Sequence, residues 1–226
     1  MSSDGAQGNA LSGFNPGLSA DARYIAFTSN ASNLVSGDTN GTGDTFVRDR
    51  VAGTTTRVSV SSAGRQATHN AGGESISGDG RFVAFVSRAD LVPGDTNRDF
   101  DVFVRDRRSG TTSRVSVSGT GAQANARSTH AAISADGQYV VFESLASNLV
   151  VGDTNGALDV FVRNRLAGVT NRVSVAADGT QSGGASTFSP TPITAHGRSV
   201  VFVTGAPLVP RDTNGTYDIF VRDRRS

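Results

Sequence analysis

Four copies of one short loop carry the residues of this chain whose types and spacing could bind a metal ion. The copies are DTNGTGD at 38–44, DTNRDFD at 95–101, DTNGALD at 153–159 and DTNGTYD at 212–218. Oxygen ligands at loop positions 1, 3 and 7 form the kind of set that calcium prefers, and glycine at position 4 allows a sharp wrap. The predicted ligands are Asp38, Asn40, Asp44, Asp95, Asn97, Asp99, Asp101, Asp153, Asn155, Asp159, Asp212, Asn214 and Asp218.

The second copy differs from the others at two positions. Asp99 adds a carboxylate at loop position 5, while Arg98 replaces the glycine and brings a cation beside the expected ion. Position 12 holds the bidentate acid of an EF-hand, but here it lies five residues along a strand from position 7, roughly 16 Å away at about 3.3 Å per residue. We therefore exclude the residues at that position: Asp49, Asp106, Asn164 and Asp223.

The same loops also have a simpler interpretation as turns. Asp and Asn side chains bond the backbone two residues ahead, Asn-Gly favours a positive φ, and repetition follows from duplication of the unit. Because most copies hold only two acids, calcium is expected to bind weakly, with a dissociation constant of about 0.1 to 1 mM. The sequence leaves both interpretations open.

Other candidate sites are weaker. Arg-Asp-Arg recurs at 48–50, 105–107 and 222–224, and its alternating charges favour an ion-pair ladder between adjacent units over a basic ring for anionic ligands. No GxSxG turn is present, and no histidine is placed to activate a serine. The histidines occupy non-equivalent repeat positions: His69, His130 and His196. We therefore expect that the chain is not an enzyme.

The elements that carry these loops belong to a larger repeat. The loop copies begin at 38, 95, 153 and 212, so each starts 57 to 59 residues after the previous one. A second phrase precedes each loop, as LSADARYIAF, ISGDGRFVAF, ISADGQYVVF and ITAHGRSVVF, and a third, ending in RVSV, follows the first three. Self-similarity at a fixed period indicates one supersecondary unit stacked on copies of itself.

Within the second repeat the pattern predicts four strands, at 71–77, 81–87, 101–107 and 111–118. The second strand, RFVAFVS, is apolar at nearly every position, so both of its faces must be covered. In the fourth strand the valines of RVSV alternate with polar residues, as expected of an outer strand with one face in water. This gradient predicts an all-β fold, a β-propeller of four-stranded antiparallel blades.

These motifs resemble a known family. The phrase S-[AG]-D-G-[RQ]-[FY]-V-[AV]-F, followed by D-[VI]-F-V-R-[DN], is similar to the repeats of TolB-like propellers, a WD-type blade. The resemblance covers nearly the whole chain and implies a propeller fold, whereas propellers of this kind act as docking platforms, ligand-binding domains or substrate-gating partners of peptidases. The chain departs from the family pattern by inserting about ten residues, ending in DTNGxxD, between the second and third strands.

The repeats divide the chain into four expected blades within a single domain or propeller segment spanning 1–226. Their approximate ranges are 12–61, 70–118, 128–176 and 186–226. The last blade lacks its outer strand, so its third strand is expected to be an open edge that recruits a protein partner or a second copy. At the other end, Ser2–Gln7 matches Ser61–Gln66, the segment that follows an outer strand.

Composition excludes several classes of function. The net charge is +1, so there is no electrostatic reason to expect nucleic acid or an anionic membrane as partner. The chain has no cysteine, which excludes disulfide and thiolate chemistry, and no apolar run approaches the roughly 18 residues of a membrane helix. Every basic residue is arginine, and the only glutamates are Glu74 and Glu143.

We therefore expect a non-catalytic binding or scaffold module that holds calcium in its inserted loops. The family resemblance implies a secreted, periplasmic or cell-surface location. Two alternatives stay open: the propeller domain of a peptidase or glycan-active enzyme, and a sugar-binding, lectin-like propeller with one site per blade.

Overall fold

The structure is a computed structural model that describes residues 1–13, 16–188 and 192–224, and within these ranges it is all-β with no helix. Residues 189–191 and 225–226 of the expected fourth blade, and 14–15 of the expected first blade, lie outside the described residues. The strands are β1 (Gly17–Leu18), β2 (Tyr24–Ser29), β3 (Asp44–Asp49), β4 (Thr54–Arg57), β5 (Ala71–Ile76), β6 (Phe82–Ser87), β7 (Asp101–Asp106), β8 (Thr111–Arg114), β9 (Ser128–Ile133), β10 (Tyr139–Ser144), β11 (Asp159–Asn164), β12 (Val169–Arg172), β13 (Ser186–Thr187), β14 (Ser199–Thr204) and β15 (Asp218–Asp223).

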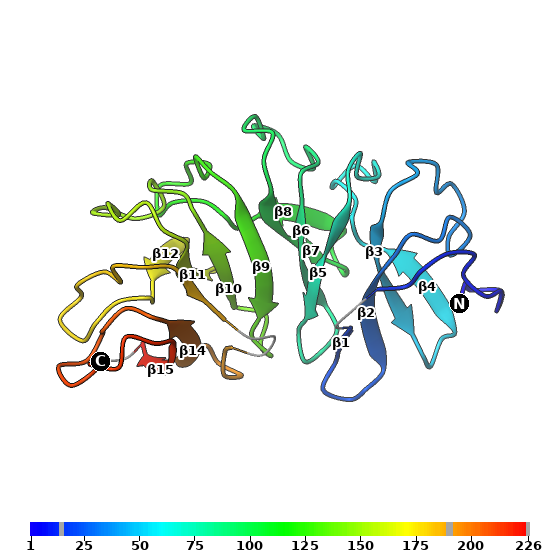
Figure 1. Cartoon of the computed structure of the whole chain (residues 1–226). Coiled ribbons are helices and arrows are strands. Elements are labelled where there is room, and N and C mark those ends of the chain that lie inside the picture. The colour runs from blue at the N-terminus through cyan, green and yellow to red at the C-terminus, as the bar shows by residue number, and fades with distance from the viewer. Residues whose placement is uncertain (14–15, 189–191, 225–226) are drawn as a thin grey trace.

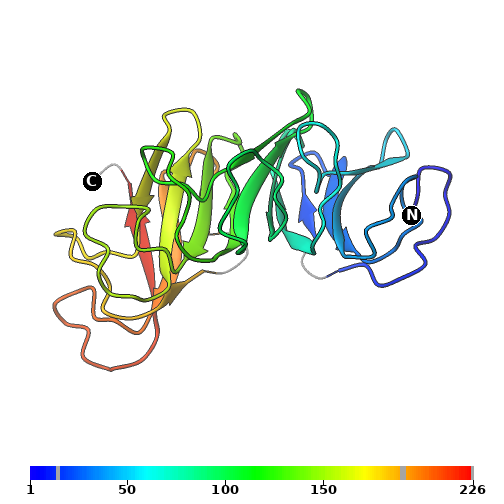
Figure 2. The ribbon, with the colours of Figure 1, turned by 90° about the horizontal axis from the view of Figure 1, so that it is seen from above.

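These strands form four antiparallel sheets in chain order, which confirms the predicted blades. Three sheets have four strands, β1 to β4, β5 to β8 and β9 to β12, and the last has three, β13 to β15, among the described residues. Figure 1 shows the sheets side by side in an open fan, with the N-terminal sheet on the right and the C-terminal sheet on the left. From above, the first and last sheets lie on opposite sides of the middle two (Figure 2).

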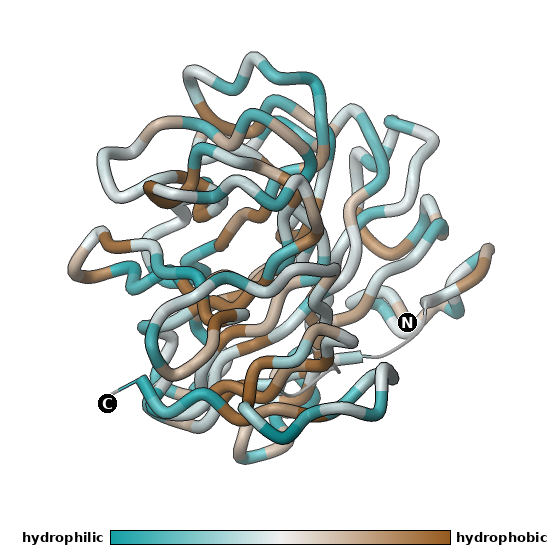
Figure 3. Tube along the Cα trace, turned by 60° about the vertical axis from the view of Figure 1, so that its left-hand side comes forward, coloured by the Kyte–Doolittle hydropathy of each residue, from teal (hydrophilic) through white to brown (hydrophobic). Residues whose placement is uncertain are grey.

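Burial follows the predicted gradient in the second strand of each blade. Val83, Ala84 and Phe85 in β6 are fully buried because a neighbouring sheet covers each face. Figure 3 shows the same division along the trace, with hydrophobic segments gathered in the strands and hydrophilic residues in the connecting loops. The apolar strands therefore pack the blades together and leave the loops to water.

The predicted outer strand is wrong in its extent. We expected a strand over 111–118 with one face in water, but β8 ends at Arg114, and the next residues turn inward. Val115 and Val117 are 3% and 7% exposed, and the Val115 N–H donates to the Val102 carbonyl. The valines and the serine of RVSV therefore belong to a buried segment. The serine can be buried there because its hydroxyl bonds an aspartate of the same blade, as described below for the first blade.

Adjacent blades meet where an aromatic ring packs on a glycine. The Tyr24 ring lies so close to Gly80 of the next blade that a Cβ there would stand 2.1 Å from it. Gly80 also has a φ of +70°, which suits only glycine in the predicted turn. The Arg107 guanidinium also stacks over the Tyr24 ring, 4.5 Å from its centre. The equivalent trios are Phe82, Gly137 and Arg165, and Tyr139, Gly197 and Arg224.

This arrangement corrects the interpretation of the Arg-Asp-Arg runs. The central acid pairs within its own blade, as Asp106 does with Arg81 at 2.6 Å, so the ion pairs do not form a ladder between blades. The flanking arginines make the contacts to the preceding blade instead. Arg105 donates to the Ser61 carbonyl of the preceding blade at 3.1 Å. Arg107 donates to the Gly80 carbonyl of its own blade and stacks on Tyr24 of the preceding one.

The N-terminal segment occupies the place of a preceding blade's trailing segment. Arg48 donates to the Ser2 carbonyl at 2.8 Å, as Arg105 does to Ser61, and the Thr55 hydroxyl donates to the Met1 carbonyl at 2.6 Å. The sequence match between Ser2–Gln7 and Ser61–Gln66 therefore has a structural basis. The first blade is completed by a segment that carries no strand of its own.

Candidate functional site

An arginine fills the centre of the first candidate calcium loop. Arg57 Nη1 lies 3.1 Å from the Asp38 carboxylate and 3.2 Å from the Asp44 carboxylate, and its side chain is only 11% exposed. Arg57 is the arginine of the RVSV phrase, at the end of β4. A guanidinium between the two acids supplies the positive charge that we had assigned to calcium.

The Asn40 amide of this loop also has internal partners. Asn40 turns its NH₂ group toward the loop, where it donates to Asp44 at 2.8 Å and to the Ala67 carbonyl at 2.9 Å. Its oxygen accepts from the Thr42 N–H, which is an Asx-type turn. The second oxygen of Asp44 accepts from the buried Ser59 hydroxyl at 2.5 Å. The loop ligands are therefore engaged in holding the turn.

The second and third copies repeat this geometry. Arg114 lies 3.2 Å from Asp95 and 3.6 Å from Asp101, and Arg172 lies 3.0 Å from Asp153 and 3.3 Å from Asp159. The amides donate to the acid as in the first copy, from Asn97 to Asp101 and from Asn155 to Asp159. Asp99 does not join the loop centre through any contact seen here: its carboxylate accepts from the Phe100 N–H at 2.8 Å.

In the fourth copy the amide contact recurs, from Asn214 to Asp218 at 3.0 Å, and the Thr216 N–H donates to the Asn214 oxygen. Asp212 is the first acid of this copy, and among the described residues no arginine bridges it to Asp218. The residues excluded at position 12 serve elsewhere, since Asp49 and Asp106 each bond an arginine and the N–H groups of the following turn.

Burial raises the pKa of the first acid in the first three loops. It raises the pKa of Asp95 to about 6, with a further contribution from the nearby Asp101 carboxylate, while Arg114 acts in the opposite sense. Burial likewise raises the pKa of Asp38 and of Asp153. The described residues contain no group of three or more His, Cys, Asp or Glu side chains placed to hold a metal ion. Calcium at these loops stays a prediction, and the geometry favours the alternative of a turn.

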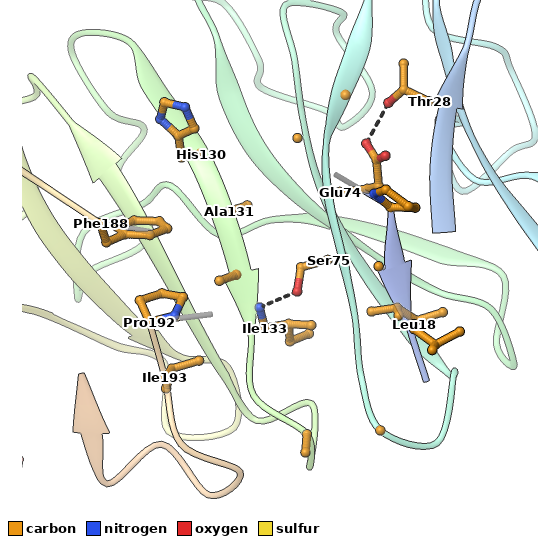
Figure 4. Close-up of a pocket in the computed structure, with 18 of the residues that line it drawn as sticks. Leu18, Thr28, Glu74, Ser75, His130, Ala131, Ile133, Phe188, Pro192 and Ile193 are labelled. Carbon is orange, nitrogen blue, oxygen red and sulfur yellow. Dashed lines mark hydrogen bonds between the residues drawn. The ribbon is translucent and has the colours of Figure 1, made fainter. Parts of the chain in front are cut away.

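A second candidate site, which sequence reasoning missed, lies where the inner strands of the blades converge. A cavity of about 1090 Å³, here called the axial cavity, is lined by described residues from all four blades. Most of its wall is small or apolar, with Leu18, Ile76 and Ile133 among the larger side chains. Figure 4 shows Leu18 and Ile133 together with Glu74, His130 and Phe188. Its size and mostly apolar wall with a few polar groups are typical of a ligand site.

Local irregularities in the inner strands bring polar side chains to this cavity. The pairing of β5 with β6 shifts register between Gly72 and Ser75, and the pairing of β9 with β10 shifts between Phe142 and Glu143. Such bulges redirect side chains out of the regular alternation. His130 lies in the second bulge with a φ of +44°, a conformation that costs a residue other than glycine of the order of 1–2 kcal/mol.

His130 belongs to a closed network around Glu143. Its Nδ1 lies 2.8 Å from Glu143 Oε2, and the other carboxylate oxygen accepts from the Thr187 hydroxyl and from the Phe188 N–H. Burial opposes ionisation of Glu143, which is 1% exposed, but the bonds from His130 and Thr187 hold its pKa below the usual range. The same bond raises the pKa of His130. Glu143 is therefore an ionised acid with every oxygen engaged.

Glu74 differs from Glu143, because only one of its two carboxylate oxygens has a hydrogen-bond partner. Its side chain lines the axial cavity and is only 8% exposed. Oε2 accepts from the Thr28 hydroxyl of the first blade at 2.6 Å, whereas Oε1 has no hydrogen-bond partner (Figure 4). Burial raises the pKa of Glu74, and the Thr28 bond offsets this only in part. A buried carboxylate oxygen without a partner is costly, so it requires an explanation.

The signal for this site was present in the sequence. Glu74 and Glu143 are the only glutamates of the chain, and at the position of Glu143 the second and fourth blades carry Val86 and Val203. An acid that replaces an apolar residue at one repeat position marks a blade-specific role. The other histidines lie elsewhere, His69 beside Thr68 and His196 at 3.2 Å from Asp136.

No family model matches the chain, and no curated protein matches it. Solved structures do. The putative TolB from Agrobacterium tumefaciens aligns over 96% of this chain and 64% of its own, with 19% identity and a TM-score of 0.56. This chain has the fold of the TolB-like β-propellers. TolB from Acinetobacter baumannii aligns over 96% of this chain and 42% of its own, with 17% identity and a TM-score of 0.52.

Propeller domains of enzymes have the same fold. The β-propeller domain of the Trilobed protease from Pyrococcus furiosus aligns over 96% of this TolB-like chain and 56% of its own, with 9% identity and a TM-score of 0.53. The chain thus spans 42% to 64% of the length of these three structures. No described helix of this propeller is long and apolar enough to cross a membrane.

Proposed function

We propose that this TolB-like propeller is a non-catalytic binding module that holds a segment of a partner peptide in the axial cavity. The observation that carries the proposal is the composition of the cavity wall, to which the inner strands of the first three blades and the segment after β13 in the fourth contribute. A segment bound there contacts every blade at once. We place the module outside the cytoplasm on the family resemblance stated above.

The character of the wall supports a binding role. Small residues such as Gly72, Ala131 and Ala195 leave room for a ligand, while Phe188 and Ile193 offer apolar surface. Gly72 lies in β5 and Ala131 in β9, so part of the wall is held by hydrogen-bonded strands and loses little order when a ligand enters. The arginine contacts described above join the inserted loops to the outer strands, which favours a structural role for these loops.

The test is selection of binders from a random peptide library displayed on phage. We expect the chain to enrich peptides that no longer bind when Ala131→Trp fills the cavity. Leu18→Trp, at a side chain that is 57% exposed, is a second cavity-filling variant in case the first fails to fold. Val151→Trp, at a fully exposed loop position outside the cavity, is the matched control. Mass spectrometry of the bound peptides checks that they are released intact.

Two results would contradict the proposal. Peptides that bind the cavity-filled variants as well as the original chain would place the binding surface elsewhere. Selected peptides that are cleaved on incubation with the purified chain would make the module an enzyme.

A further inference from the structure

Glu74, on the wall of the axial cavity, has one buried carboxylate oxygen without a partner, whereas both oxygens of the other glutamate have partners. Glu74 Oε1 makes no hydrogen bond, while both oxygens of Glu143 are engaged by Thr187, Phe188 and His130. A folded chain that leaves this oxygen unpaired loses stability. A group that lowers stability and lies on the wall of a cavity is explained if its hydrogen-bonding partner arrives with the ligand.

The missing group must be a donor and is best a cation. A carboxylate oxygen accepts hydrogen bonds and offers negative charge, so an N–H group with positive charge satisfies both needs. Among the described residues that line the cavity, no arginine or histidine bonds Glu74, and the only other titratable side chain is His130, which is engaged by Glu143. The protein therefore supplies no cation of its own at Glu74.

The other residues that line the cavity indicate the chemistry of the rest of the ligand. Glu74 lies on β5 in the second blade, while Phe188, Pro192 and Ile193 come from the fourth blade on the other side of β9 (Figure 4). Small and apolar residues separate the two sides, among them Ala131 and Ile133. A ligand that reaches both sides carries its charge at one end and apolar groups beyond it.

We infer that the axial cavity binds a primary ammonium group carrying an apolar substituent, with Glu74 as the anion that receives the ammonium. The inference rests on the proposed function, since it names the chemistry of the ligand in the same cavity. A compact ammonium fits one unpaired oxygen, whereas a planar guanidinium presents a fork for two. The hydroxyl of Thr28 occupies the second oxygen of Glu74.

Two kinds of molecule present this chemistry: a small alkylamine, and a peptide with a free N-terminus and an apolar first residue. Isothermal titration calorimetry at pH 7.5 on the full chain uses hexylamine, which is protonated there, and 1-hexanol as its neutral counterpart. A parallel pair uses one peptide from the library selection with its N-terminus free or acetylated. We expect the charged member of at least one pair to bind about tenfold more tightly or better.

The variant Glu74→Gln isolates the carboxylate. It removes the charge while keeping the shape, and we expect it to weaken binding of the charged probe about tenfold or more without lowering the melting temperature. Asp178→Asn removes one negative charge at an exposed loop position outside the cavity and is the matched control, expected to bind as the original chain does. Calcium chloride is the third probe, and it is titrated into the original chain and into the Glu74→Gln variant.

The outcomes separate this inference from the proposed function. If selected peptides bind in the cavity but acetylation and Glu74→Gln change nothing, the cavity is a peptide site and the ammonium inference is wrong. If calcium binds and loses affinity in Glu74→Gln while hexylamine and the free peptide do not bind, the anion holds a metal ion and the inference is again wrong. If no probe and no peptide binds the cavity, both proposals fail.

Discussion

At the scale of single residues, the contacts of three buried arginines decide how the inserted loops work. Arg57, Arg114 and Arg172 each lie between two aspartates that are nearly inaccessible to water. Desolvated acids of this kind need a compensating charge, and the arginine provides it from the neighbouring strand. The loop is therefore tied to the outer edge of its blade by an internal cation.

Removing one of these arginines should destabilise the fold. Arg172→Met leaves Asp153 and Asp159 buried without their cation, and loss of one partner from a buried pair costs about 3–5 kcal/mol. Chemical denaturation monitored by circular dichroism measures the change. Arg127→Met, at an exposed arginine, is the control and should alter the free energy of unfolding by less than about 0.5 kcal/mol. Equal effects from both substitutions would show that the buried contact contributes nothing.

The same contacts lead to an expectation for calcium. Because an arginine already lies between the two acids in each of the first three loops and offsets one of their charges, millimolar calcium should leave the melting temperature of the original chain unchanged. Differential scanning calorimetry in calcium chloride and in chelator makes the comparison. A ligand at a hundred times its dissociation constant would add about 2.7 kcal/mol, so a reproducible rise in melting temperature that chelator reverses would support calcium sites after all.

Glu74 should make stability depend on pH in a defined direction. Its pKa is raised by burial, so the folded chain holds the proton more tightly than the unfolded chain does. Stability from this group is present below the unfolded pKa of about 4.3 and is lost as the pH rises through the folded pKa. Glu74→Gln should therefore be more stable than the original chain at pH 8, with the gain shrinking toward pH 4.

Thermal melts of both proteins across that range provide the measurement. His130 and Glu143 titrate equally in the two proteins and cancel in the difference. A difference between the two that does not vary with pH would mean that Glu74 titrates alike in the folded and unfolded chains.

At the scale of elements, the turn between the first two strands of each blade also forms the joint between blades. Gly137 has a φ of +71°, and a Cβ there would stand 2.3 Å from the Phe82 ring of the preceding blade. Gly94 has a similar φ of +76° but has open space around it. The two glycines thus share a backbone requirement and differ in packing.

We expect Gly137→Ala to cost more stability than Gly94→Ala. Both substitutions strain the backbone by about 1–2 kcal/mol, and overpacking against Phe82 adds about 1–3 kcal/mol to the first. Denaturation of the two variants in parallel isolates the packing contribution. If both lose the same amount, the aromatic ring moves aside freely and the joint is not tightly packed.

At the scale of the whole molecule, the last blade exposes a face that the other blades bury. Ile219 and Val221 on β15 are 74% and 67% exposed, whereas their counterparts Val102 and Val104 on β7 are 0% and 1% exposed beneath the following blade. Apolar faces of this size are commonly covered by another strand or chain. Self-association through this face stays a prediction.

Charge on this face should reduce self-association. We expect Ile219→Lys combined with Val221→Lys to shift the chain toward monomer in size-exclusion chromatography with light scattering. Val151→Lys combined with Leu166→Lys, at two exposed apolar positions in other blades, is the control and should leave the assembly unchanged. A chain that is already monomeric at high concentration would show that this face is not covered by a second copy.

The sequence by itself determined the repeat, the blades, the inner strands and the turn glycines, because each depends on local patterns: period, alternation and the conformational freedom of Gly80 and its counterparts. It did not determine which side chains that are distant in sequence come into contact. Arg57 and Asp38 lie in different elements of the first blade, and only the fold brings them to 3.1 Å. Glu74 and Thr28 belong to different blades, so the pairing of one oxygen and the freedom of the other were decided by how blades pack. Interactions between charged or polar groups depend on distance and burial, which tertiary structure alone sets.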